Sequence, residues 1–127
     1  MARILIANDN DEFLGTCKDV LEGAGHSVRP VASGALAVEL ARQWCPDAIV
    51  VDWKMPDTDG TAVIRALRRD LATASIPILM MSGSARGAEA ALQAGADAFL
   101  AKPFNDDQLL AAIDDMLALA AKAGAPT

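Results

Sequence analysis

The chain has 127 residues, a length that fits one domain able to bury a packed core. Apolar residues make up 53% of the chain but fall in short runs, and none approaches the roughly 18–20 residues needed to cross a bilayer. The net charge of −6 argues against a surface for nucleic acid or for anionic lipid. We therefore expect a cytoplasmic protein without membrane insertion or direct nucleic-acid binding.

The cysteine and histidine content limits metal and redox chemistry. Cys17 and Cys45 lie far apart and form no CxxC pair, so we expect two buried, reduced thiols. His26 is the only histidine, which excludes a site built from several histidines.

In the first half of the chain, short apolar runs alternate with amphipathic segments. The pattern predicts strands over 3–7, 27–32 and 48–52, and helices over 11–23 and 34–44. Asp11 is the expected cap of the first helix, and Pro30 indicates that the second strand lies at a sheet edge. The second helix has apolar residues at helical spacing: Leu36, Leu40 and Trp44.

The second half continues the alternation, with predicted strands over 77–82 and 97–101 and predicted helices over 59–71, 86–94 and 106–121. In the helix over 59–71, the arginines are expected to face outward and the apolar residues inward, the latter being Val63, Ile64, Leu67 and Leu71. The helix over 86–94 contains Gly87, so we expect it to be short and mobile, since Gly costs about 1 kcal/mol relative to Ala inside a helix.

Five β–α units follow from this reading. Strands that are continuous apolar runs are typical of a parallel sheet covered on both faces, and right-handed crossovers then produce a doubly wound three-layer α/β sandwich. We expect one domain over 1–121, with 122–127 as a tail or the start of a linker.

Four predicted strands end on polar residues at what would be one edge of the sheet, where such folds bind ligands. Asp9 and Asp52 would bring two carboxylates together, and such a pair repels by about 4 kcal/mol at ~4 Å and an effective dielectric of ~20 unless it recruits a cation such as Mg²⁺. Lys102 would offset the remaining charge and Ser82 would supply a hydroxyl donor. This set predicts a clamp for a phosphoryl group, in which a carboxylate can be the nucleophile.

These motifs resemble the receiver domain of two-component response regulators, similar to chemotaxis regulators, over essentially the whole chain. The matching pieces are Ile4–Asp9, Pro46-Asp47, Val50–Asp52, Met55-Pro56, Asp59-Gly60, Ser82, Gly95–Asp97 and Lys102–Phe104. The resemblance implies a flavodoxin-like five-stranded parallel sheet in the order 2-1-3-4-5.

It also implies roles for individual residues. Asp52 matches the phosphoacceptor, and Lys102 and Ser82 match the residues that bind the phosphoryl group. The ligands of Mg²⁺ would be Asp9, Asp52, the backbone carbonyl of Lys54 and, through water, Asn8.

Further positions match the switch and the control of signal lifetime. Ser82 and Phe99 correspond to the switch pair, and Lys54 and Ser84 to positions that tune how water reaches the acyl phosphate. The implied partners are a histidine kinase or histidine phosphotransfer protein and a downstream target protein, contacted through the fourth helix, fifth strand and fifth helix. The domain would catalyse only its own Mg²⁺-dependent phosphoryl transfer and dephosphorylation, and would not be a conventional enzyme.

The sequence also departs from the family pattern. Asn8 stands where the family usually has an acid, which predicts weaker Mg²⁺ binding. Phe99 is often tyrosine in the family, and Trp53 takes the place of a smaller aliphatic residue. Asn8 also leaves open a divergent receiver that binds partners without phosphorylation. An aspartyl phosphatase is disfavoured because Lys54 takes the place of its general acid, and a flavin carrier because the acids after the first strand would repel phosphate.

Overall fold

The computed structural model describes residues 2–55 and 57–124 and confirms the ten predicted elements, with ends within a few residues of those expected. The strands are β1 (Arg3–Ala7), β2 (Ser27–Val31), β3 (Ala48–Asp52), β4 (Ile78–Ser82) and β5 (Ala98–Ala101). The helices are α1 (Asp11–Gly23), α2 (Gly34–Trp44), α3 (Gly60–Arg69), α4 (Gly87–Ala94) and α5 (Asp106–Gly124).

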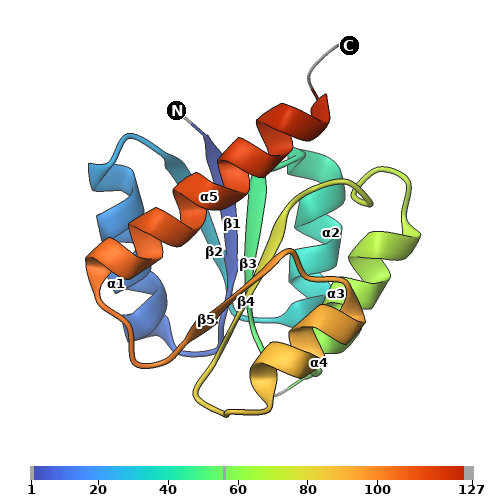
Figure 1. Ribbon diagram of the computed structural model, residues 1–127, viewed down its shortest axis with the longest axis horizontal. Helices are drawn as coiled ribbons and strands as arrows, with labels where there is room; N and C mark the ends of the chain where they lie inside the picture. Colours follow the sequence, from blue (N-terminus) through green and yellow to red (C-terminus); the bar gives the residue numbers. More distant parts are fainter. Residues whose placement is uncertain (1, 56, 125–127) are drawn as a thin grey trace.

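The strands form one parallel sheet in the order β2-β1-β3-β4-β5, which confirms the expected topology. Helices α1 and α5 cover one face, and α2, α3 and α4 cover the other (Figure 1). Strand β2 is an edge strand, as Pro30 predicted, because proline cannot donate a ladder hydrogen bond.

Alternation along the strands divides the core into two layers. Leu5, Ile49 and Met80 face α2, α3 and α4, whereas Ile4, Val50 and Met81 face α1 and α5, and all six are fully buried. Because both faces are apolar, the central strands have no polar side and every polar group of the sheet edge falls at a strand end. Within the described residues, no helix is long and apolar enough to span a membrane.

The first helix is capped by a different residue from the one predicted. The Asn10 side chain accepts a hydrogen bond from the Phe13 N–H at 3.0 Å, and Asp11 is the first helical residue. Asn10 has extended backbone geometry, which a cap requires, and Asp11 instead adds negative charge to the positive end of the helix dipole.

The apolar face of α2 also differs from the prediction. Ala37 and Ala41 are fully buried, whereas Leu36 is 57% exposed. The helix packs through its small residues, and Leu40 and Trp44 lie at the margin of the core. Periodicity identified the helix correctly but selected the wrong stripe, because alanine carries little hydrophobic weight in such a pattern.

Helix α3 ends at Arg69, two residues earlier than predicted, and leaves Leu71 96% exposed. Asp70 is extended, and its side chain accepts from the Ala72 N–H and pairs with Arg42. The buried Thr73 hydroxyl donates to the Leu67 carbonyl at 2.7 Å, which satisfies a free carbonyl of the last turn.

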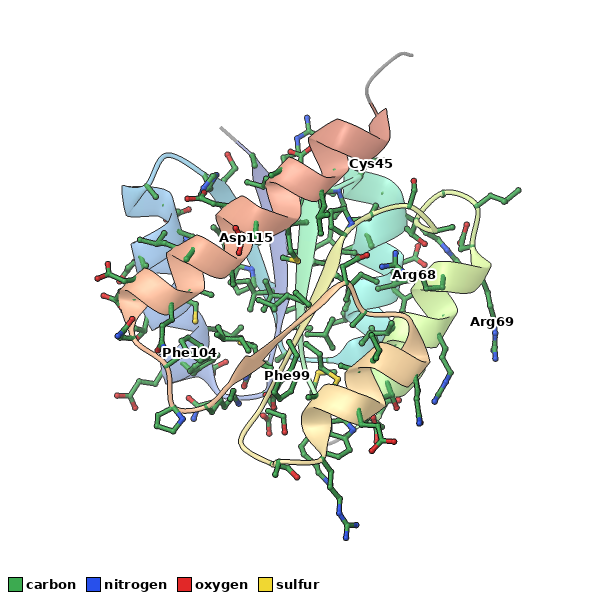
Figure 2. The ribbon with its side chains drawn as sticks, viewed as in Figure 1. Cys45, Arg68, Arg69, Phe99, Phe104 and Asp115 are labelled. Atoms are coloured by element: carbon green, nitrogen blue, oxygen red, sulfur yellow. The ribbon has the colours of Figure 1, made fainter. Side chains whose placement is uncertain are left out.

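Arg68 does not face outward as predicted. Its guanidinium donates to the carbonyls of Ala74, Ile76 and Gly95 at 2.6–2.9 Å and pairs with Asp97 at 2.7 Å. Asp97 also accepts from the Ile78 N–H. Arg68 thus joins α3 to the start of β4 and the end of α4; Figure 2 shows Arg69 pointing away from the sheet.

The two cysteines have different environments, so the prediction of two buried thiols is half wrong. Cys17 is buried in the layer under α1, and burial raises the pKa of its thiol to about 11. Cys45 is exposed because it ends α2 in the left-handed conformation, with φ of 53°. The left-handed conformation is common at the carboxyl end of a helix, where the chain turns out of the helix.

Candidate functional site

The carboxyl ends of four neighbouring strands gather the predicted polar residues at one edge of the sheet. Asp52 ends β3, Ser82 ends β4 and Lys102 follows β5. The register pairs Ala7 with Val51, so Asn8 and Asp9 leave β1 beside Asp52. Ser82 pairs with Ala101, which places Lys102 one residue beyond it.

Asp52 and Lys102 form an ion pair. The Lys102 ammonium lies 2.5 Å from Asp52 Oδ1, and the two side chains are 31% and 8% exposed respectively. A carboxylate this deeply buried requires a cationic partner, because removing the cation would leave an uncompensated charge in a medium of low dielectric. Within the described part of the chain, the other oxygen, Oδ2, has no hydrogen bond.

The fold holds Lys102 in position from two sides. Its N–H donates to the Ser82 carbonyl at 2.8 Å, and its ammonium lies 5.0 Å from the centre of the Phe13 ring. The Phe13 ring packs edge-on against Phe104 at 5.8 Å. Cation–π contact and backbone pairing thus direct the lysine along the sheet edge toward Asp52.

Ser82 is 4% exposed and its hydroxyl oxygen accepts the Ser84 N–H at 3.0 Å. The Ser84 hydroxyl in turn accepts the Arg86 N–H at 3.3 Å. These bonds form a compact loop between β4 and α4. The Ser82 hydroxyl proton is not used by that loop, so the group can still donate.

Asn8 and Asp9 have different surroundings although they are adjacent. Asn8 is 2% exposed, and its side-chain oxygen accepts the Asn10 N–H at 2.8 Å. Its backbone N–H donates to the Val31 carbonyl. Asn8 therefore organises the turn from β1 into α1, while Asp9 is exposed and open to solvent.

Backbone contacts join the segment directly after β3 to the start of α3. Lys54 and Asp59 form an antiparallel bridge, and the Gly60 N–H donates to the Trp53 carbonyl at 2.7 Å. The Lys54 side chain turns back over the Trp53 ring, with the ammonium 5.0 Å from its centre. The indole N–H of Trp53 is buried without a partner among the described residues.

The donor set at this edge fits Mg²⁺. The exposed Asp9 and the buried Asp52 supply two carboxylates at this edge, and Mg²⁺ uses one or two carboxylates and keeps several waters. In residues 2–55 and 57–124 no group of three His, Cys, Asp or Glu could hold a metal.

Phe99 lies on the opposite side of β5 from Phe104 (Figure 2). It is half-buried and packs against the layer under α2, α3 and α4. Together with Leu92 and small residues of α4 it lines an apolar cavity of about 210 Å³. At its other end the ring approaches Gly87, the first residue of α4.

Two features of the site are absent from the sequence prediction. Phe13 and Phe104 line an open groove of about 350 Å³ between α1 and α5, beside Lys102.

Asp57 accepts from the N–H groups of Gly34 and Ala35 and from Ser33, and these bonds lower the pKa of its carboxyl. An aspartate in a loop is a common helix-capping residue, so the sequence indicates that Asp57 could cap a helix. It does not indicate that the helix is α2, which lies more than twenty positions earlier in the chain.

Comparison with known proteins shows the family to which the chain is similar. Residues 4–114 match the family model described as the response regulator receiver domain. The chain is 37% identical over 119 residues to the DNA-binding dual master transcriptional regulator RpaA of Synechocystis, covering 92% of this chain but about half (49%) of that protein. It is 35% identical over 116 residues to the chemotaxis protein CheY of Bacillus subtilis, covering 91% of this chain and 97% of CheY.

A solved structure adds a metal-bound example. The receiver domain of the sensor histidine kinase PA1611 from Pseudomonas aeruginosa has a magnesium ion coordinated in its active-site cleft. It superposes on this chain with a TM-score of 0.85 at 29% identity, covering 92% of this chain and 98% of that one.

Proposed function

This chain belongs to the response regulator receiver family of two-component signalling, and we propose that it is a switch turned on by phosphorylation of Asp52. The observation that carries the proposal is the Lys102–Asp52 pair at 2.5 Å, set at the strand ends beside Ser82. A buried carboxylate with one oxygen neutralised and the other unpaired is a nucleophile held in place.

The chemistry is an in-line transfer from a phosphohistidine. Asp52 Oδ2 attacks phosphorus, the P–O bond forms as the P–N bond breaks, and the imidazole leaves with the bonding pair. Lys102, already at Oδ1, neutralises the added charge, and the Ser82 hydroxyl donates to a phosphoryl oxygen. Hydrolysis of the acyl phosphate by water later resets the domain.

Magnesium would be held by Asp9, Asp52 and the Lys54 carbonyl, with Asn8 reached through water, and when bound it neutralises phosphoryl charge. The bridge between Lys54 and Asp59 supports this role because it fixes the backbone that carries the carbonyl. Lys54, two residues after Asp52, and Ser84, two residues after Ser82, are the proposed control points for water access.

The phosphodonor would dock on the groove beside Lys102. Phe13 and Phe104 offer apolar area next to the reacting carboxylate, which suits a histidine kinase or phosphotransfer protein that must present its imidazole there. Phosphorylation adds about −1.5 to −2 charge, and Ser82 and Phe99 pass the change to the α4–β5–α5 face that binds a downstream protein. We place this reaction in the cytoplasm, where histidine kinases present their phosphohistidine.

Acetyl phosphate with Mg²⁺ tests the proposal. Intact-mass measurement should show a single phosphoryl adduct on the wild type and none on Asp52→Asn, with Lys102→Met strongly slowed. Asp115→Asn, an exposed acid on α5, is the matched control and should be labelled like the wild type. Equal labelling of Asp52→Asn would refute the assignment.

A second candidate is a receiver that binds partners without phosphorylation. The observation that favours it is Asn8, which is engaged with the Asn10 N–H and contributes no charge for metal binding. Beryllofluoride with Mg²⁺ separates the two: an adduct and a change in Trp53 fluorescence support the switch, and absence of both supports the second candidate.

A further inference from the structure

Gly87 occupies the point where α4, Ser82 and Phe99 meet. It is buried and is the first residue of α4. A Cβ built on it would lie 2.8 Å from the Ser82 Cβ, 2.8 Å from Phe99 Cε1 and 3.0 Å from Phe99 Cζ. Contacts below 3.0 Å are not seen for real Cβ atoms, so no larger residue fits without a shift of its neighbours.

The loop before Gly87 keeps it there. The Gly87 N–H donates to the Ser84 carbonyl at 3.0 Å, and the Ser84 N–H donates to the Ser82 hydroxyl. The start of α4 is therefore tied by two successive hydrogen bonds to the side chain at the end of β4. A movement of Ser82 cannot leave this glycine unaffected.

We infer that Gly87 is a positioning residue of the switch. Because it has no side chain, it leaves a space between the start of α4, the Ser82 Cβ and the Phe99 ring, and the edge of that ring occupies this slot. This inference rests on the proposed function, because it concerns how the Ser82 response reaches the α4–β5 face. The ring's Cε1 and Cζ fill the slot in the structure, and a methyl group at position 87 would expel them.

The two obstacles to such a methyl group differ in how readily they yield. The far end of the Phe99 ring can rotate away into the cavity that it shares with Leu92. The Ser82 Cβ is bonded to the backbone of β4 and cannot rotate away, so α4 must also shift. Gly87→Ala should therefore displace the ring and separate Ser82 from α4.

A thermal double-mutant cycle tests the packing. Gly87→Ala should lower the Tm by about 5 °C or more, as overpacking does in a domain of this length. Phe99→Leu lacks the two ring atoms concerned, so the same substitution in that background should cost less, and the remaining loss comes from the clash with the Ser82 Cβ. Gly83→Ala is the control, since its nearest neighbour is the Lys102 Cβ at 4.0 Å, and its Tm should be unchanged. Equal losses in both backgrounds, or no loss, would overturn the inference.

Hydrogen exchange of residues 87–101 tests the coupling, with saturating beryllofluoride and Mg²⁺. The wild type and Gly83→Ala should both form the adduct and change protection in this segment. Gly87→Ala should form the adduct, read by Trp53 fluorescence, and lose the change. If Gly87→Ala forms the adduct and changes protection as the wild type does, the inference about Gly87 is refuted and the proposed function is not. If the wild type forms no adduct, both the proposed function and the inference that rests on it are refuted.

Discussion

At the scale of single residues, the charged side chains of the site are held in place by uncharged neighbours. Asp52 is buried and would be costly to leave unpaired, so Lys102 is held over Phe13 and by the Ser82 carbonyl to meet it. The side-chain oxygen of Asn8 shapes the turn into α1, whereas the neighbouring Asp9 is exposed and is the proposed ligand of Mg²⁺.

Asn8→Asp should tighten Mg²⁺ binding by about threefold or more, because a third carboxylate raises the negative potential at the ion. The new carboxylate can still accept the Asn10 N–H, so the turn is retained. Titration calorimetry with MgCl₂ measures the change. Asn10→Asp, which alters the exposed helix cap instead, serves as the comparison, and unchanged or weaker affinity in Asn8→Asp would contradict the prediction.

Arg68→Met should lower the free energy of unfolding by about 2–4 kcal/mol, because it strips donors from three carbonyls and breaks the pair with Asp97. Urea unfolding measures this loss. Arg69→Met removes an exposed arginine one residue later and should change stability by no more than about 0.5 kcal/mol. Similar values for the two variants would show that the Arg68 contacts carry no special weight.

At the scale of elements, predictions succeeded where the signal was local. The apolar runs of β1, β3 and β4 and the polar residues after them were identified correctly, because strand ends coincide with the loss of apolar character. The predictions failed for Arg68 and for the buried face of α2. Whether an arginine turns inward depends on carbonyls 6 to 27 positions away, which periodicity does not encode.

Asp57 joins two elements, because its carboxylate accepts hydrogen bonds at the start of α2 from a loop after β3. Those bonds lower the pKa of the carboxyl below its ordinary value of about 3.9. A depressed folded-state pKa contributes stability above the unfolded value, and this contribution is lost as pH falls through the folded value.

Asp57→Asn should therefore be less stable than the wild type at pH 7, and the difference should narrow as pH falls below about 4. Urea midpoints at pH 7 and at pH 3 measure both differences. Asp115→Asn, on the exposed face of α5, should show no such pH-dependent gap. A gap for Asp57→Asn that is as large at pH 3 as at pH 7 would exclude the charge as its cause.

At the scale of the molecule, the sheet gathers residues from positions 8 to 102 at one edge, and the parallel topology accounts for this. The alternation of apolar runs and helices predicted parallel strands whose carboxyl ends share one edge, and the resemblance to receiver domains supplied the strand order that the structure confirms. The slot at Gly87 could not be predicted from the sequence, since it depends on tenths of an ångström between a helix start and a ring.

A ligand that binds only the folded state should stabilise the whole domain. Beryllofluoride with Mg²⁺ at 100 times its Kd should raise the free energy of unfolding by about 2.7 kcal/mol. Asp52→Ala lacks the acceptor and should show no increase, which urea unfolding with and without the additive can measure. Equal stabilisation of Asp52→Ala would mean that the additive binds elsewhere.

The groove lined by Phe13 and Phe104 adjoins the proposed reaction site, because the Phe13 ring lies 5.0 Å from the Lys102 ammonium and packs edge-on against Phe104. The same aromatic side chain thus borders both the groove and the lysine that pairs with Asp52. Under the proposed function, a substitution of Phe13 that changed the preferred phosphodonor would also disturb that lysine. Divergence of donor preference would then require compensating changes that keep the lysine in place.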